Sequence, residues 1–240
     1  SCFVDAIVAA SPDLAARIEE SDVTTVANYP RRQWAERSQS GVSPRESETP
    51  TRFVLRGSLS ERRAIPTVLD AIERVPEVHD VRLAIGGKFA SDAIRERVEA
   101  RSRASERVEL VPWMETLADV IEHFRACDVG VHYFRPVPNM ADAVHRSNKL
   151  FQYMATGLPV IVPTVGAWPD FVREVGCGVA VDPEDPDALA AAFTDLHCHA
   201  ERRSALAENG HQAVLDRYNW ETEAETLLAL YDRLLSYTSN

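Results

Sequence analysis

The fold class is decided by one stretch of the sequence, SNKLFQYMATGLPVIV, which covers residues 147–162. Ser147 is a common N-cap residue and Gly157 a common residue after a helix end, so the stretch predicts a helix over 148–156. The apolar run 158–162 then predicts a strand. A helix followed at once by a short apolar strand is typical of a parallel sheet with helices on both faces.

The same alternation continues on both sides of this stretch. The expected strands are 53–56, 81–85, 107–111, 128–133, 158–162 and 178–181. The expected helices between them are 62–75, 90–104, 116–125, 148–156 and 168–175. A helical tail is expected over 185–196, 200–217 and 220–237. The pattern predicts an α/β fold with a doubly wound parallel sheet and a helical C-terminal tail.

The N-terminal part of the chain is organised differently. Residues 4–8 and 23–27 are short candidate strands, and Pro12 opens a helix expected to reach about Glu20. Residues 30–51 are rich in Pro, Ser and Arg and have no sustained period, which indicates a connection between domains. Because the chain starts inside an apolar run without an initiator Met, we expect it to be processed or truncated.

The composition of the chain bears on the kind of partner it can bind and on its cellular compartment. The chain has 240 residues and a net charge of −11, which works against nucleic-acid binding because phosphates would be repelled. The four cysteines form no CxxC pair, which argues against a zinc site or a disulfide framework and favours the reducing cytoplasm. Only Lys88 and Lys149 are lysines among the 26 Lys and Arg residues, which fits a salt-rich cytoplasm or a GC-rich genome equally.

Ligands of doubly wound sheets bind where strands end and helices begin. The segment LRGSLSERR, residues 55–63, leaves the first main strand with a glycine, which lets a ligand approach the backbone, and with arginines, which bind phosphate through a planar fork. A solvated helix start would show the same residues.

The segment 86–88, GGK, leaves the next strand similarly but is no GxGxxG fingerprint. Ser147 starts a helix whose free amides would attract an anion, and Gln152, a turn later, would reach a ribose.

The run NKLFQYMATGLPVIVPTVGAWPDFV, residues 148–172, resembles the signature of GT-B fold glycosyltransferases of the large retaining family that includes sucrose synthases and many bacterial mannosyltransferases. Further segments are similar to this family in the same order: GSLSERRAIPTVLDAI (57–72), VELVPWM (108–114), GCGVAVDPEDPDALAAAF (176–193) and YNWETEAETLLALYDRLL (218–235). The order of these segments is more specific than any single motif.

The resemblance implies a division of the chain into four parts. Residues 52–217 would be a Rossmann-like nucleotide-sugar-binding domain, the C-terminal half of a GT-B architecture, and 218–240 its closing helix. Residues 1–29 would be the remnant of an N-terminal acceptor domain, and 30–51 an interdomain linker. This fragment alone would have little activity, because the family's acceptor site and catalytic histidine come largely from the first domain.

The implied reaction is the transfer of a hexose from a nucleotide diphosphate sugar, as co-substrate, to a sugar, lipid-linked or protein acceptor with retained configuration. The resemblance implies no metal and no other cofactor. The partners would be the donor, the acceptor and the rest of the chain's own N-terminal domain, with no nucleic acid. The expected location is the cytoplasm, with peripheral association at the inner membrane face as a further option.

The resemblance also places individual residues. Arg63 would be the catalytic cation at the phosphates, and the donor would contact Gly57, Ser58, Lys88, Val111, Trp113, Ser147, Asn148, Lys149 and Gln152. A lone tryptophan such as Trp113 most often has its ring in the core, so its backbone would shape the base pocket. Four polar residues lie in or beside the loop after 128–133, namely His132, Arg135, His145 and Arg146. They could contact the sugar or the phosphates, but we expect each of them to be solvated.

The chain departs from the family at several of these positions. The family commonly has two glutamates separated by seven residues, whereas this chain has Val144 and Gln152 at those positions. Ser58 stands where the family has arginine, and Arg63 where it has lysine. Two alternatives therefore stay open. One is a GT-B fold sugar-nucleotide epimerase, which would need acid and base groups in the cleft. The other is a non-catalytic nucleotide-sugar-binding module, which the missing glutamates favour.

Overall fold

The computed structural model describes residues 4–19, 22–38 and 50–238. Its centre is a six-stranded sheet in the order β5-β4-β3-β6-β7-β8, with every pair of neighbours parallel. The strands are β3 (Thr51–Leu59), β4 (Val81–Phe89), β5 (Val108–Leu110), β6 (Val129–Val131), β7 (Val160–Pro163) and β8 (Gly178–Val181). The predicted doubly wound, Rossmann-like sheet is confirmed. Strands β3 and β4 run three to four residues past their predicted ends.

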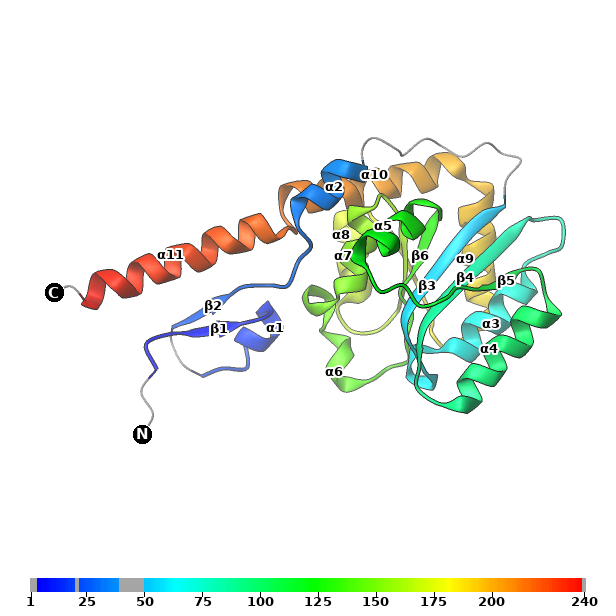
Figure 1. Ribbon diagram of the computed structural model, residues 1–240, viewed down its shortest axis with the longest axis horizontal. Coiled ribbons are helices and arrows are strands. Elements are labelled where there is room, and N and C mark those ends of the chain that lie inside the picture. Colours follow the sequence, from blue (N-terminus) through cyan, green and yellow to red (C-terminus); the bar gives the residue numbers. More distant parts are fainter. Residues whose placement is uncertain (1–3, 20–21, 39–49, 239–240) are drawn as a thin grey trace.

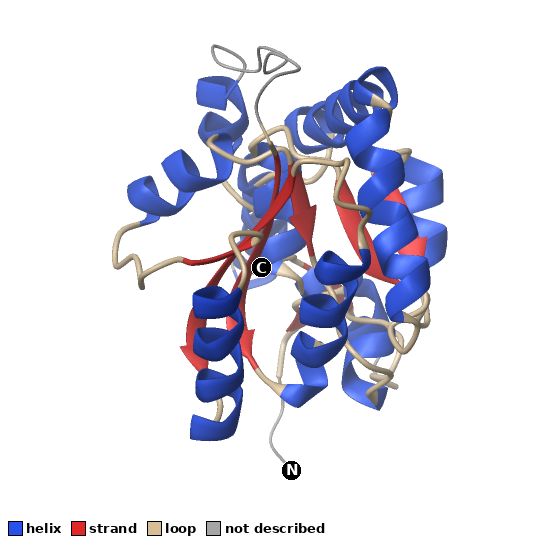
Figure 2. Cartoon of the chain, turned by 90° about the vertical axis from the view of Figure 1, so that its right-hand side faces the viewer, coloured by secondary structure: helices blue, strands red, loops and turns tan. Residues whose placement is uncertain are grey.

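Helices cover both faces of the sheet (Figure 2). On one face lie α3 (Ile65–Arg74), α4 (Asp92–Ala104) and α9 (Pro186–Cys198). On the other face lie α5 (Leu117–Arg125), α7 (Asn148–Ala155), α8 (Trp168–Val175) and α10 (Ala200–Asp216). Short helices α6 (Pro138–Ala141), η1 (Glu61–Arg63) and η2 (Val144–Arg146) occupy the loops. Helices on both faces bury the middle of the central strands, and residues 53–55 of β3 and 83–85 of β4 are accordingly apolar without a gap.

The N-terminal segment forms a separate pair of parallel strands, β1 (Ile7–Ala9) and β2 (Val23–Thr25), with α1 (Pro12–Ala15) between them. The prediction that this helix reaches about Glu20 is wrong, because it is capped at Ala16. The last helix, α11 (Trp220–Thr238), extends away from the main sheet and lies beside β2 (Figure 1). Arg233 Nη2 on α11 donates to Asp22 Oδ1 at 2.7 Å, so the helical tail contacts the N-terminal segment.

The helix at Arg32–Ser38 was not predicted, and neither were the short helices α6 and η2. Helix α2 (Arg32–Ser38) lies inside the stretch 30–51 that was interpreted as an interdomain linker. Its Ala35 is fully buried, and the N–H of Arg32 donates to Glu221 Oε2 on α11 at 2.7 Å. Contacts with distant elements therefore stabilise a helix that has no clear period of its own. Residues 39–49 of the predicted linker lie outside the described residues.

The sheet changes winding direction between β3 and β6. From β3 the chain proceeds outward to β4 and β5, whereas β6, β7 and β8 add to the opposite side. The carboxyl ends of β3 and β4 approach closely, since a Cβ on Gly87 would lie 1.8 Å from the oxygen of Gly57. Both glycines have positive φ, +138° and +151°, which an L side chain rarely adopts. Doubly wound sheets bind ligands at this kind of switch point.

No helix among the described residues combines the length and the apolar composition that crossing a membrane requires.

Candidate functional site

A cavity of about 290 Å³ lies at the switch point, where β3 ends. Its walls come from the end of β3, from η1, from the segment after β6 and from the start of α7. The lining residues are 55–58, Arg63, 131–133 and 146–149. Four of them are cationic, namely Arg56, Arg63, Arg146 and Lys149, and none carries a carboxylate. The charge of this lining suits an anionic ligand.

Helix α7 turns its N-terminus toward the cavity. Ser147 is the N-cap, as predicted, and its Oγ accepts the N–H of Leu150 at 3.3 Å. The same Oγ lies 3.2 Å from Nε2 of His132, which fixes the serine from the β6 side. The free amides of the first turn and the positive end of the helix dipole add to the attraction for an anion.

The cationic side chains in the cavity are close enough to repel one another electrostatically. Burial lowers the pKa of Lys149, and the nearby charges of Arg56 and Arg63 lower it further. Burial is also the main cause of the lowered pKa of Arg63. Lys149 Nζ donates to Gln152 Oε1 at 2.9 Å, a neutral partner that leaves its charge uncompensated. A bound anion would relieve this repulsion.

His132 is not the solvated loop residue that the sequence indicated. Its side chain is 5% exposed, because the residues after β6 continue into the core. Burial lowers its pKa to about 3, with further lowering by Arg63 and Lys149. The ring is therefore neutral near pH 7, and its contact with Ser147 makes it a residue that positions the start of α7.

The three other loop residues are not simply solvated either. Arg146 Nη2 lies 3.0 Å from Asp13 Oδ2, so it forms an ion pair with the N-terminal segment. His145 Nδ1 lies 2.7 Å from the hydroxyl of Tyr29, and its ring packs among aromatic side chains. Arg135 is half-buried. For Arg146 and His145, contacts with distant segments, which the sequence does not reveal, shield much of the side chain from water.

Arg56 was quoted in the predicted loop but not chosen as a site residue. It lines the cavity and is only 7% exposed. Its Nη2 donates to the carbonyl of Met114 at 3.2 Å, and its guanidinium lies 5.4 Å from the centre of the Trp113 ring. A charged residue inside the apolar run of a buried strand was the signal that could have identified it.

Three predicted donor-binding residues lie beside the cavity rather than in its lining. Lys88 pairs in register with Ser58, and its Nζ lies 5.0 Å from the centre of the Trp113 ring. Val111 is buried against Gly86. Trp113 is 52% exposed, so the expectation that its ring lies in the core is wrong. Trp113 lies in the loop after β5, which is an edge strand of the sheet.

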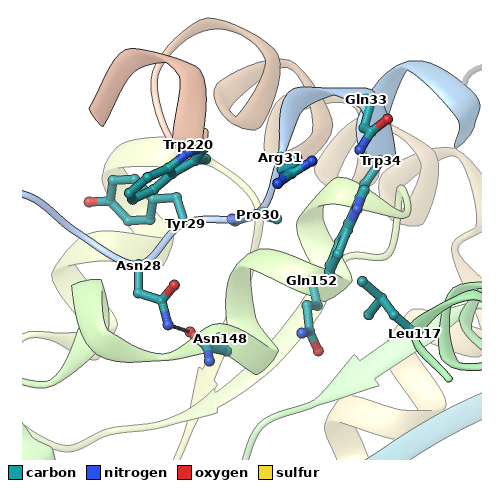
Figure 3. Close-up of a pocket in the computed structure, with 10 residues that line it drawn as sticks. All are labelled: Asn28, Tyr29, Pro30, Arg31, Gln33, Trp34, Leu117, Asn148, Gln152 and Trp220. Carbon is teal, nitrogen blue, oxygen red and sulfur yellow. Dashed lines mark hydrogen bonds between the residues drawn. The ribbon is translucent and has the colours of Figure 1, made fainter. Parts of the chain in front are cut away.

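A second cavity, of about 630 Å³, adjoins the first at Asn148 (Figure 3). Its lining residues are Asn28, Tyr29, Pro30, Arg31, Gln33, Trp34, Leu117, Asn148, Gln152 and Trp220. Asn28 Nδ2 donates to Asn148 Oδ1 at 3.2 Å, so the N-terminal segment contacts the first residue of α7. Gln152 thus faces the larger cavity while its oxygen is held by Lys149 in the smaller one.

The predicted site residues consequently fall into three groups. Gly57, Ser58, Arg63, Ser147, Asn148 and Lys149 line the smaller cavity, Gln152 lines the larger one, and Lys88, Val111 and Trp113 flank the first. Their roles toward a ligand stay predictions. In the described ranges no three His, Cys, Asp or Glu side chains gather in a way that could hold a metal ion.

Known proteins resemble this chain in sequence. The family described as "Glycosyl transferases group 1" matches residues 50–199. D-inositol 3-phosphate glycosyltransferase of Xylanimonas cellulosilytica is 32% identical over 179 residues, which cover 69% of this chain and 38% of that protein. MMP alpha-(1->4)-mannosyltransferase of Mycolicibacterium hassiacum is 24% identical over 198 residues, covering 80% and 46%. The chain spans less than half the length of these curated relatives.

A solved structure resembles the fold. Anabaena Alr3699/HepE in complex with UDP superposes with a TM-score of 0.75 at 15% identity, over 96% of this chain and 64% of that chain. At this identity the likeness shows the fold, which is that of GT-B glycosyltransferase structures. Since the family match covers more than half of the sequence, the chain belongs to the group 1 glycosyltransferases.

Proposed function

We propose that this chain is the donor-binding half of a retaining hexosyltransferase, which moves a sugar from a nucleotide diphosphate sugar to an acceptor. The observation that carries the proposal is the cavity at the β3–β6 switch point. Arg63, Lys149 and the N-terminus of α7 converge there, and no carboxylate lines it. This combination fits a diphosphate.

In this proposal the donor lies across the carboxyl end of the sheet. Its diphosphate rests on residues 147–149 and Arg63, close to the backbone at 57–58. The ribose reaches Gln152, and the base lies toward Val111 and Trp113 with Lys88 beside them. Residues 52–217 form the donor domain, 30–51 the linker, 218–240 the closing helix, and 1–29 belong to the acceptor-binding half.

The chemistry follows from the charges. The bond between the anomeric carbon and the diphosphate oxygen breaks, and a bond to an acceptor hydroxyl oxygen forms on the same face of the sugar. The proton of that hydroxyl passes to the departing diphosphate. Negative charge grows on the departing oxygen, so cations fixed beside it bind the transition state more tightly than the donor. In this proposal Arg63, Lys149 and the α7 dipole neutralise the leaving group without a metal or another cofactor.

The relatives support the proposal at a coarse level. Two are named as glycosyltransferases, and the Anabaena structure is described as a complex with UDP. The donor sugar and the sugar, lipid-linked or protein acceptor are unspecified partners here, together with the rest of an acceptor-binding half. The proposed location is the cytoplasm, at its membrane face if the acceptor is lipid-linked. An epimerase would need a proton donor and acceptor in the cavity, and the neutral His132 is a poor one.

Calorimetry on this chain tests the proposal. UDP and GDP are titrated alongside uridine and guanosine. We expect at least one nucleoside diphosphate to bind and its nucleoside to bind barely, because the cationic cavity supplies most of the attraction. Arg63→Ala should weaken diphosphate binding. Arg62→Ala is the matched control, since Arg62 is an exposed neighbour on η1 outside the cavity lining. Equal affinity for nucleoside and diphosphate would remove the phosphate site.

A further inference from the structure

The position of Arg56 in β3 directs its side chain toward the cavity. Alternate residues of a strand face the same side of a sheet, and Val54, two residues earlier, packs in the core beneath α5 and α7. Arg56 and Ser58 share that face, but only Arg56 carries a charge, and its side chain is long enough to bring this charge into the cavity. Its backbone is held there by a 3.2 Å hydrogen bond from its N–H to the hydroxyl of Tyr153.

The guanidinium of Arg56 is incompletely bonded. Nη2 donates to the carbonyl of Met114, whereas Nη1 is buried and has no partner among the described residues. A buried donor without an acceptor is costly, and the cost is larger for a charged group. Because Arg56 is 7% exposed and lines the cavity, the cavity is the place from which an acceptor can reach Nη1.

The charges of the cavity favour an anion over a neutral acceptor. Arg146 is compensated by Asp13, but Arg56, Arg63 and Lys149 have no ion pair with a described carboxylate. Arg56 and Arg63 both lower the pKa of Lys149, so the three charges act on one another. One compact anion with several charged oxygens would satisfy all three cations at once.

We infer that Arg56 is a third phosphate-binding cation of the site, and that its Nη1 donates to an oxygen of the diphosphate. The inference rests on the proposed function only for the nucleoside part of the ligand. The site for pyrophosphate is inferred from the charges and contacts of the cavity and does not depend on that function. The same guanidinium lies against the exposed Trp113 ring, so Arg56 joins the phosphate cavity to the flanking residues Lys88 and Trp113.

Binding measurements on this chain with pyrophosphate, UDP and uridine test the inference. The variants are Arg56→Met, which keeps the length of the side chain without its charge, and Arg56→Lys, with Arg62→Met as an exposed control. We expect Arg56→Met to weaken pyrophosphate and UDP about tenfold to a hundredfold, the scale of one charged hydrogen bond. Arg56→Lys should lose less, Arg62→Met should bind like the parent, and uridine binding should not change.

Several results would overturn the inference. Unchanged pyrophosphate affinity in Arg56→Met would do so, and so would an equal loss for UDP and uridine, which would place Arg56 against the base. If Arg56→Met fails to fold, the pyrophosphate affinity of Arg56→Lys tests the inference instead. An affinity of Arg56→Lys equal to that of the parent would count against it. Pyrophosphate binding that depends on Arg56 while UDP binds no better would support the anion site and contradict the proposed nucleotide-sugar function.

Discussion

Arg146 Nη2 lies 3.0 Å from Asp13 Oδ2, and this ion pair joins the N-terminal segment to the wall of the cationic cavity. The pair is largely shielded, with 27% of the arginine and 15% of the aspartate side chain exposed. Asp13 therefore competes with any anion in the cavity for the charge of Arg146. Asn28 and Tyr29, at the end of the same segment, line the neighbouring cavity.

Asp13→Asn should raise the affinity for pyrophosphate about twofold to fivefold, because Arg146 becomes free to face the ligand. The scale is that of a partly exposed ion pair, about 0.5–1 kcal/mol. The measurement is calorimetric titration of the parent chain and the variant. Asp142→Asn is the matched control, since Asp142 pairs with Arg17 at 3.9 Å at the surface. Weaker binding in Asp13→Asn, at unchanged melting temperature, would contradict the competition.

Gln152→Ala should weaken binding of a nucleoside diphosphate by about 1–2 kcal/mol, because a polar partner of the ribose is lost and Lys149 loses its hydrogen bond. Gln152→Glu should be tolerated, since a carboxylate also accepts from the ribose hydroxyls and from Lys149. Gln212→Ala serves as control, because Gln212 pairs with Asp216 on the outer side of α10. Full affinity in Gln152→Ala would assign Gln152 a purely structural role.

His132 should make stability fall in mild acid. Its pKa is lowered from about 6.5 to about 3 in the folded chain, so between these values only the unfolded chain binds the proton. Stability is therefore complete above pH 6.5 and is lost as the pH falls below it. Between pH 7.5 and 5 the parent should lose about 2 kcal/mol more than His132→Asn in urea unfolding.

The control for this comparison is His199→Asn, which removes a histidine whose side chain is 62% exposed and which does not line the cavity. The acid-dependent loss that we assign to His132 should remain in this variant. Identical pH dependence in the parent and in His132→Asn would show that His132 takes up a proton in the folded chain as readily as in the unfolded one.

The main sheet could be predicted because its strands contain short apolar runs between helices, and this local pattern is visible in the sequence alone. Helix α2 could not, since its stability comes from burial of Ala35 and from Glu221, far along the chain. The extra length of β3 and β4 was hidden by Gly57 and Gly87, which look like strand breakers. In the structure they pair in register and let the two strand ends approach.

The site was predictable where a residue type and a helix start coincide, as at Ser147 and Lys149. It was less predictable where a side chain could point either into the protein or into solvent. Arg56 and Arg62 look equally available in the sequence, but Arg56 is buried in β3 whereas Arg62 is exposed on η1. His132 follows an apolar strand, and only the packing of the next residues shows that it is buried rather than solvated.

The proposed role of Arg63 in neutralising the leaving group is tested most directly by the turnover of Arg63→Ala in a protein that joins this chain to an acceptor-binding half, assayed with a panel of nucleotide sugars. Arg63 lines the cavity and Arg62 beside it does not, so Arg62→Ala is the internal control. We expect kcat to fall about a hundredfold or more, with donor affinity falling much less, because the cation binds the departing diphosphate most tightly. Arg63→Lys should restore part of the rate. An active enzyme whose kcat is the same in Arg63→Ala as in Arg62→Ala would contradict this role.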